Sequence, residues 1–179
     1  MPLKTSYALM RAAVIAVGAL AAVSARAEEP PTAGLMTSVS VADARDVLTE
    51  AGVDVQKVVF GPDGFTITAA ITPERHVWFD GMNCKGSGEA MACTEFKISA
   101  GWELDTPAHA TALAKKLTYN YTSVFADGSN LDLWRMDVTY GGIAKKHLLW
   151  TVEELLELRQ QAEKVVFPTV GEPTPVKRP

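Results

Sequence analysis

The sequence predicts an α+β fold in which an antiparallel sheet packs against helices, with the element order α-β-β-β-β-α-β-β-α. Three segments, at about 40–52, 106–121 and 144–167, place apolar residues at helical spacing. Between them lie short runs that alternate apolar and polar residues and are separated by turns containing Gly and Asp. Runs of strands between isolated helices are typical of α+β proteins with antiparallel sheets.

Capping residues predict where the helices begin. Ser40 is a good N-cap and has Asp43 three residues after it, so the first helix is expected to start there. Thr106 caps the second helix, with Pro107 at its first position. The last helix carries an apolar stripe that also contains an arginine: Leu148, Val152, Leu155, Leu156 and Arg159.

The strands are predicted at residues 57–60, 65–71, 75–84, 93–102, 123–126 and 131–140. The turns at 61–64 and 127–130 make the first two and the last two of these strands hairpins. In the second strand Phe65, Ile67 and Ala69 alternate with less apolar residues, which indicates a sheet with one face buried.

Both ends are predicted to lie outside the folded domain. A basic start, an apolar run at 12–23 and the small-x-small sequence Ala25-Arg26-Ala27 are typical of a secretory signal peptide. The predicted segments are 1–27, the signal peptide; 28–38, a linker; 39–167, the folded domain; and 168–179, a disordered Pro-rich tail. We therefore expect a periplasmic or secreted protein that is not inserted in the membrane after cleavage, because the apolar run is too short to span it.

The segment that follows the predicted cleavage site is acidic. The whole chain has 17 Lys and Arg against 21 Asp and Glu, and residues 1–27 hold three of the basic residues and no acid. The remainder has 17 − 3 = 14 basic and 21 acidic residues, a net charge of −7. Such a surface argues against nucleic acid and anionic lipid as partners.

The two cysteines, Cys84 and Cys93, lie at the facing ends of two neighbouring predicted strands. Disulfides persist outside the cytosol, so the predicted export favours a bond between them. We expect this bond to be structural, because its spacing is far from that of a redox Cys-x-x-Cys motif.

The cysteine pair also predicts the register of its two strands. When Cys84 faces Cys93, the numbers of facing residues sum to 177. Phe79 then faces Ile98 on one side of the sheet, and Asp80 faces Lys97 on the other. The same parity places Trp78 and both cysteines on the side of the Asp80–Lys97 ion pair.

An alternative hypothesis is a copper site. Met82, Cys84, Met91 and Cys93 form two Met-x-Cys units whose soft sulfur atoms would suit Cu(I). Exported thiols oxidise readily, and Met is a common filler of apolar gaps, so we predict no metal and no cofactor.

No sequence motif for catalysis is present. The chain lacks a Gly-x-Ser-x-Gly elbow, a His-Glu-x-x-His helix and a phosphate-binding loop. The histidines His76, His109 and His147 share no motif. The prediction is a protein that is not an enzyme; an unrecognised enzyme, built from residues that folding brings together, is the other alternative.

Trp78 is the candidate partner-binding residue, together with Asp80 and Lys97. The parity places it on the side of the sheet opposite Phe79. An exposed aromatic side chain beside a polar pair is a usual anchor for a protein partner, provided that no helix covers this side.

Several stretches resemble the YbjN family. HVWFDG at 76–81 followed by KISAGW at 97–102 resembles the paired central strands of that family, and LWRMDV at 133–138 with GGI at 141–143 resembles its second hairpin. The resemblance extends over about 41–166 and implies a sheet flanked by helices, similar to type III secretion chaperones, without established catalytic residues. The export signal and the cysteine pair distinguish this chain from many relatives.

The expected function is that of a non-catalytic periplasmic protein-interaction module, chaperone-like or regulatory. Its expected partner is an unidentified protein, and the chaperone-like resemblance also implies a homodimer.

Overall fold

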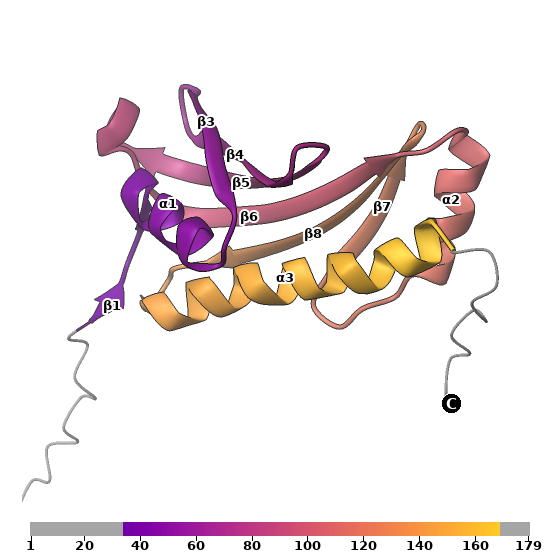
Figure 1. Ribbon diagram of the computed structural model, residues 1–179. Helices are drawn as coiled ribbons and strands as arrows, with labels where there is room; N and C mark the ends of the chain where they lie inside the picture. Colours follow the sequence, from indigo (N-terminus) through magenta and orange to yellow (C-terminus); the bar gives the residue numbers. More distant parts are fainter. Residues whose placement is uncertain (1–33, 169–179) are drawn as a thin grey trace, which may run out of the picture. The chain divides into compact units, whose positions relative to one another are not determined.

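The computed structural model describes residues 34–168 and confirms the α+β fold (Figure 1). The main helices and strands follow the predicted order, with three additional two-residue strands. In chain order the elements are β1 (Leu35–Met36), β2 (Val39–Ser40), α1 (Val41–Glu50), β3 (Asp54–Phe60), β4 (Phe65–Thr72), β5 (Arg75–Lys85), the 3-10 helix η1 (Gly88–Ala90), β6 (Ala92–Glu103), α2 (Pro107–Lys116), β7 (Ser123–Asp127), β8 (Asn130–Val138), β9 (Ile143–Ala144) and α3 (Lys145–Val166).

The main sheet has the strand order β3-β4-β5-β6-β8-β7, and every neighbouring pair is antiparallel. The short strand β2 adds to β6 at its cysteine end. β8 rather than β7 lies beside β6, because α2 carries the chain from the end of β6 to the far edge before it returns. β3 and β7 are therefore the two edges of the sheet.

All three helices contribute to one core on one face of the sheet. α1 contacts β3 and β4, α2 contacts β7 and β8, and α3 contacts β6 and β8, along which it runs in Figure 1. The largest fully buried side chains come from these helices and from alternate strand positions: Leu48, Ile67, Phe79, Phe96, Ile98, Leu131, Leu133, Leu148 and Leu155. We call the opposite side of the sheet the outer face.

The predicted helix starts are confirmed by their hydrogen bonds. The Asp43 amide donates to Ser40 Oγ at 3.1 Å, and the Ser40 amide donates to Asp43 Oδ2 at 3.0 Å, which completes a capping box. At α2 the His109 amide donates to Thr106 Oγ1 at 3.2 Å, with Pro107 directly after the cap. Each bond satisfies an amide that has no carbonyl partner inside its helix.

A buried arginine attaches α3 to β8. Arg135 forms an ion pair with Glu154, and its guanidinium lies 4.6 Å from the centre of the Trp150 ring. Burying a charge is costly unless it is paired. Here the carboxylate of Glu154 and the aromatic face of Trp150 together compensate the charge of Arg135.

The structure alters two predicted boundaries substantially. The second helix, predicted over about 106–121, ends at Lys116, because Leu117 already has an extended backbone and Tyr119 forms a β-bridge with Thr122. Residues 35 and 36, inside the predicted linker 28–38, form β1 and pair with β9 next to the start of α3. A two-residue strand has too little alternation to be read from a sequence. The rest of that linker up to residue 33, the predicted signal peptide 1–27 and the predicted tail beyond residue 168 lie outside the described residues. None of the helices within residues 34–168 has both the length and the apolar character needed to cross a membrane.

Candidate functional site

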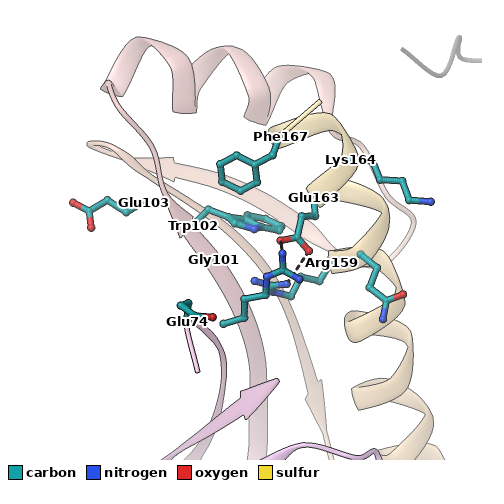
Figure 2. Close-up of a pocket in the computed structure, with 10 residues that line it drawn as sticks. Glu74, Gly101, Trp102, Glu103, Arg159, Glu163, Lys164 and Phe167 are labelled. Carbon is teal, nitrogen blue, oxygen red and sulfur yellow. Dashed lines mark hydrogen bonds and ion pairs between the residues drawn. The ribbon is translucent and has the colours of Figure 1, made fainter. Parts of the chain in front are cut away.

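Two of the hollows formed by residues 34–168 lie on opposite sides of the sheet. On the helix side, a pocket of about 710 Å³ opens between the C-terminal half of α3 and the ends of β5 and β6, with Trp102, Glu163 and Phe167 around it (Figure 2). On the outer face, a groove of about 570 Å³ runs beside the turn between β3 and β4, and Asp80, Met82 and Lys97 line it. The outer-face groove therefore contains two of the predicted partner-binding residues, Asp80 and Lys97.

The predicted register between β5 and β6 is confirmed, because the residue numbers of all eight facing pairs sum to 177. Phe79 faces Ile98, and Asp80 faces Lys97. Phe79 and Ile98 are buried against the helices, whereas Trp78, Asp80 and Lys97 are only partly buried. The alternation of the strands therefore assigns Trp78 and the ion pair to the outer face, as the parity predicted.

The polar centre of the outer face is a short network across three strands. Lys97 Nζ lies 2.9 Å from Asp80 Oδ2, and the Thr66 hydroxyl donates to Asp80 Oδ1 at 2.7 Å. Partly exposed ion pairs of this kind contribute only about 0–1 kcal/mol to stability. The network is therefore better suited to orienting charged groups at the surface than to holding the fold together.

Apolar side chains continue the outer face on both sides of this network. The strand pairings define two rows that cross the sheet: Lys57, Thr68, Trp78, Ser99, Trp134 and Ser123 form one, and Val59, Thr66, Asp80, Lys97 and Met136 form the other. Met136 is 46% exposed, and Val59 at the β3 edge is also exposed. Trp78 and Trp134 thus flank Ser99, one strand away on each side.

Trp134 and Met136 were not among the predicted site residues. The sequence places them on a strand that alternates, but it does not indicate which neighbour that strand has. Only the pairing of β8 with β6 brings Trp134 next to Ser99 and Met136 next to Lys97.

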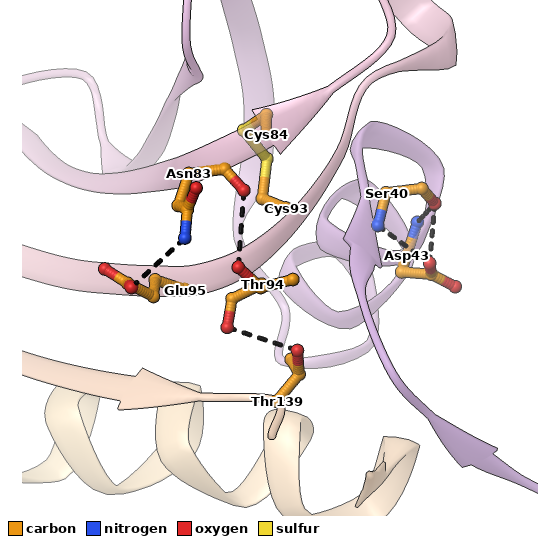
Figure 3. The surroundings of a disulfide bond; sticks show 8 residues. All are labelled: Ser40, Asp43, Asn83, Cys84, Cys93, Thr94, Glu95 and Thr139. Atoms are coloured by element: carbon orange, nitrogen blue, oxygen red, sulfur yellow. Dashed lines mark hydrogen bonds between the residues drawn. A yellow bond between two sulfur atoms is a disulfide. The ribbon is translucent and has the colours of Figure 1, made fainter. Parts of the chain in front are cut away.

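The predicted disulfide between Cys84 and Cys93 is present, at the end of the β5–β6 hairpin (Figure 3). Cys93 is fully buried in the core, and a Cβ added to Gly81 would stand only 2.6 Å from its Sγ. The same Cβ would meet the ring of Phe65, which also belongs to the core. The sulfur therefore points to the helix side, and the prediction that the cysteines share the outer face with Asp80 and Lys97 is wrong.

The reason is a local break in the alternation of both strands. In β6, the buried residues Cys93 and Phe96 are three positions apart instead of two. Asn83 has φ +53°, in the left-handed region, and it lies between the facing pairs Met82–Glu95 and Cys84–Cys93 without a facing residue of its own. Its carbonyl instead accepts a hydrogen bond from the Thr94 hydroxyl at 3.3 Å. A residue in this conformation turns the strand, so the residues beyond it change sides.

The sulfur ligands of the copper hypothesis are not brought together as free groups. Cys84 and Cys93 are bonded to each other, Met91 is buried in the core, and Met82 lines the outer groove. Among residues 34–168 there is also no group of three or more His, Cys, Asp and Glu side chains that could hold a metal ion.

The three histidines lie apart. His76 is on β5 with its ring 6.5 Å from that of Trp78, and His109 is in the first turn of α2. His147 lies in α3, where its Nε2 is 2.7 Å from Asp137 Oδ2 and its ring is 5.7 Å from that of Trp150. The His147–Asp137 pair is partly exposed and joins α3 to β8, close to the Arg135 contact.

The helix-side pocket was also not predicted. Its deepest charged residue is Arg159, whose side chain is 3% exposed. An arginine within the apolar stripe of the last helix was the signal in the sequence, but its neighbours Arg75 and Trp102 come from other elements.

No protein-family model and no curated protein matches the sequence. Two solved structures are similar to it. An uncharacterised protein from Methanothermobacter thermautotrophicus has 11% identity, covering 72% of this chain and 96% of that one, with a TM-score of 0.49. YbjN from E. coli, a candidate transcription regulator, has 12% identity, covering 72% of this chain and 90% of that one, with a TM-score of 0.50. The α+β fold of residues 34–168, with three α-helices and an antiparallel sheet, therefore resembles that of YbjN.

Proposed function

We propose that this protein is an exported, non-catalytic interaction module of the YbjN type, which binds another protein through its outer face. One observation carries the proposal. Trp78 and Trp134 flank the middle of a sheet face on which none of the three described helices packs, beside the Asp80–Lys97 pair.

The chemistry of this face favours a protein partner. Aromatic residues and Met are enriched at the centres of protein interfaces, and Trp is prominent among the residues that contribute most to binding. The outer face combines two tryptophans with the exposed Met136 and Phe125. The Asp80–Lys97 pair supplies charges of both signs that would set the register of a bound segment.

The regulatory description of YbjN suggests a regulatory role here as well. We place such a role in protein contacts rather than in direct binding of nucleic acid. Residues 28–179 carry a net charge of −7, which repels a phosphate backbone. A second copy of the chain is one partner that this face could take, and the mass of the purified protein in solution tests it.

The proposed compartment is the periplasm or the exterior of the cell. The sequence of residues 1–27 and the Cys84–Cys93 disulfide both support it. Sequencing of the N-terminus of the protein from its own cells should find Glu28 first. A chain that begins with Met1 in the cytosol would contradict export.

Binding is tested with the protein fixed to beads and exposed to an envelope extract. We expect Trp78→Ala to lose the captured partner, whereas Tyr121→Ala should keep it, because Tyr121 is 85% exposed in the loop before β7 and belongs to neither outer-face row. The double variant Asp80→Lys with Lys97→Asp keeps an ion pair between the two positions but swaps the places of the positive and negative charges. It should therefore also fail to capture the partner. Unchanged capture by both outer-face variants would refute the proposal.

A further inference from the structure

The helix-side pocket contains a buried charge that the fold compensates only in part. Arg159 Nη1 lies 3.3 Å from Glu163 Oε2, and the guanidinium lies 5.2 Å from the centre of the Trp102 ring. Glu163 is shared, because Arg75 Nη2 lies 2.8 Å from its other oxygen. Figure 2 shows Arg159 and Glu163 beside the face of Trp102.

The cluster of Arg75, Glu163 and Arg159 therefore has two guanidinium groups and one carboxylate, an excess of one positive charge. Lys164 adds a further cation, while Glu74 and Glu103 line the rim and are exposed. The buried Arg135 differs from Arg159, because its ion-pair partner Glu154 is not shared with a second arginine. Burial lowers the pKa of Arg159, and the nearby charge of Arg75 lowers this pKa further, while Glu163 raises it.

The pocket wall also contains two N–H groups without an acceptor. Trp102 Nε1 and Arg159 Nε are both buried and make no hydrogen bond within the described part of the chain. A buried donor without a partner costs about 1–3 kcal/mol. Both atoms have almost no accessible surface, so a ligand in the pocket reaches them only if side chains move, whereas the guanidinium of Arg75 is exposed to the pocket.

The shape and lining of the pocket restrict what can enter. Its volume of about 710 Å³ is within the range of small-molecule sites. Trp102 and Phe167 provide aromatic surface, so the ligand has an apolar part. The lining residues carry three positive charges (Arg75, Arg159 and Lys164) and three negative ones (Glu74, Glu103 and Glu163). A monoanion is matched by the single excess charge of the Arg75–Glu163–Arg159 cluster, whereas a dianion such as phosphate would leave one negative charge unmatched.

We propose that this pocket binds a small organic monocarboxylate. Its carboxylate pairs with Arg75, which is 47% exposed and shares the carboxylate of Glu163 with Arg159. Planar guanidinium groups are suited to carboxylates because they donate two parallel hydrogen bonds. The apolar part of the ligand packs between Trp102 and Phe167.

Phenylacetate is the probe, and 2-phenylethanol, which has the same ring without the charge, is its control. Titration of the full chain in an ¹⁵N NMR experiment should move the indole N–H signal of Trp102 and leave those of Trp78, Trp134 and Trp150 in place. Trp102→Phe identifies the signal. We expect saturation by phenylacetate below about 10 mM and no saturation by the alcohol.

Two matched charge variants complete the test. Arg75→Gln should weaken phenylacetate binding by at least about tenfold. Lys146→Gln removes the same charge at the opposite end of α3 and should bind as the parent does. Circular dichroism verifies that both variants are folded. Equal binding of acid and alcohol, an unmoved Trp102 signal, or unchanged affinity in Arg75→Gln would each overturn the proposal.

Discussion

Reduction of the Cys84–Cys93 disulfide should destabilise the protein by an amount that can be worked out from the chain. Reduction is a cleaner perturbation than Cys→Ala, because Cys93 is 0% exposed and its truncation would add the cost of a cavity. The bond joins residues nine positions apart. It therefore restricts a short loop of the unfolded chain.

In the chain-entropy relation, a loop of about nine residues corresponds to about 8.6 cal/mol/K, or about 2.6 kcal/mol at 25 °C. For a domain of this size, such a loss lowers the melting temperature by roughly 8–13 °C. The free energy of unfolding is measured by urea denaturation with and without reductant. Titration of thiols in the denatured, unreduced protein should first show that no free thiol is present.

The variant with both Cys84→Ala and Cys93→Ala is the control, because reductant should leave its stability unchanged. A loss of less than about 0.5 kcal/mol in the parent protein would show that the bond constrains the unfolded chain far less than the loop relation requires. Two free thiols before reduction would refute the disulfide itself and revive the copper hypothesis.

Three further predictions concern single side chains. Gly81→Ala should destabilise the protein by about 1–3 kcal/mol in urea denaturation, because the new methyl group would stand 2.5 Å from the Phe65 ring and 2.6 Å from Cys93 Sγ. Gly61→Ala is its control and should be nearly neutral, since the nearest atom to its Cβ is 3.5 Å away; equal losses would contradict the core position of the sulfur. Ser40→Ala should cost about 1 kcal/mol of the free energy of unfolding through loss of the capping box, and an unchanged midpoint would show that the cap is not formed in solution. Burial raises the pKa of Asp132 in the folded state; the charge of Lys97 opposes this rise and that of Asp127 adds to it. The ionised carboxylate therefore destabilises the folded protein at pH values above its folded-state pKa, and this destabilisation disappears below the ordinary pKa of 3.8. Asp132→Asn should therefore raise the melting temperature at pH 7 but not at pH 3, and the reverse order would contradict this sign.

The parts of the fold that depend on local pattern were predictable from the sequence. The cap at Ser40 and the alternation of Phe65, Ile67 and Ala69 each act within a few residues, and the structure confirms both. The register between β5 and β6 was also predictable, because the pairing of Cys84 with Cys93 determines the other facing pairs, and these keep the predicted sum on both sides of Asn83. The side of the sheet on which the cysteines lie was not predicted correctly. Asn adopts the left-handed conformation of Asn83 more often than most other residues, but the apolar and polar pattern of this strand did not indicate that it does so here.

Most of the candidate sites depend on long-range packing, and this limits prediction from sequence. Trp134 joins the outer face only because the α2 connection places β8 beside β6. The helix-side pocket needs Arg75 from β5, Trp102 from β6 and Arg159 from α3 to meet. The unusual position of Arg159 in an apolar stripe indicated a buried charge, but it did not indicate which groups would surround it.

Site-specific photo-crosslinking in living cells tests the binding role of the outer face most directly. A photoreactive phenylalanine analogue is introduced in place of Trp78 in one strain and in place of Tyr121 in another. We expect a covalent adduct of defined mass from position 78 and none of that mass from position 121. Identical adducts from both positions, or none from position 78, would contradict the claim that this protein works through its outer face.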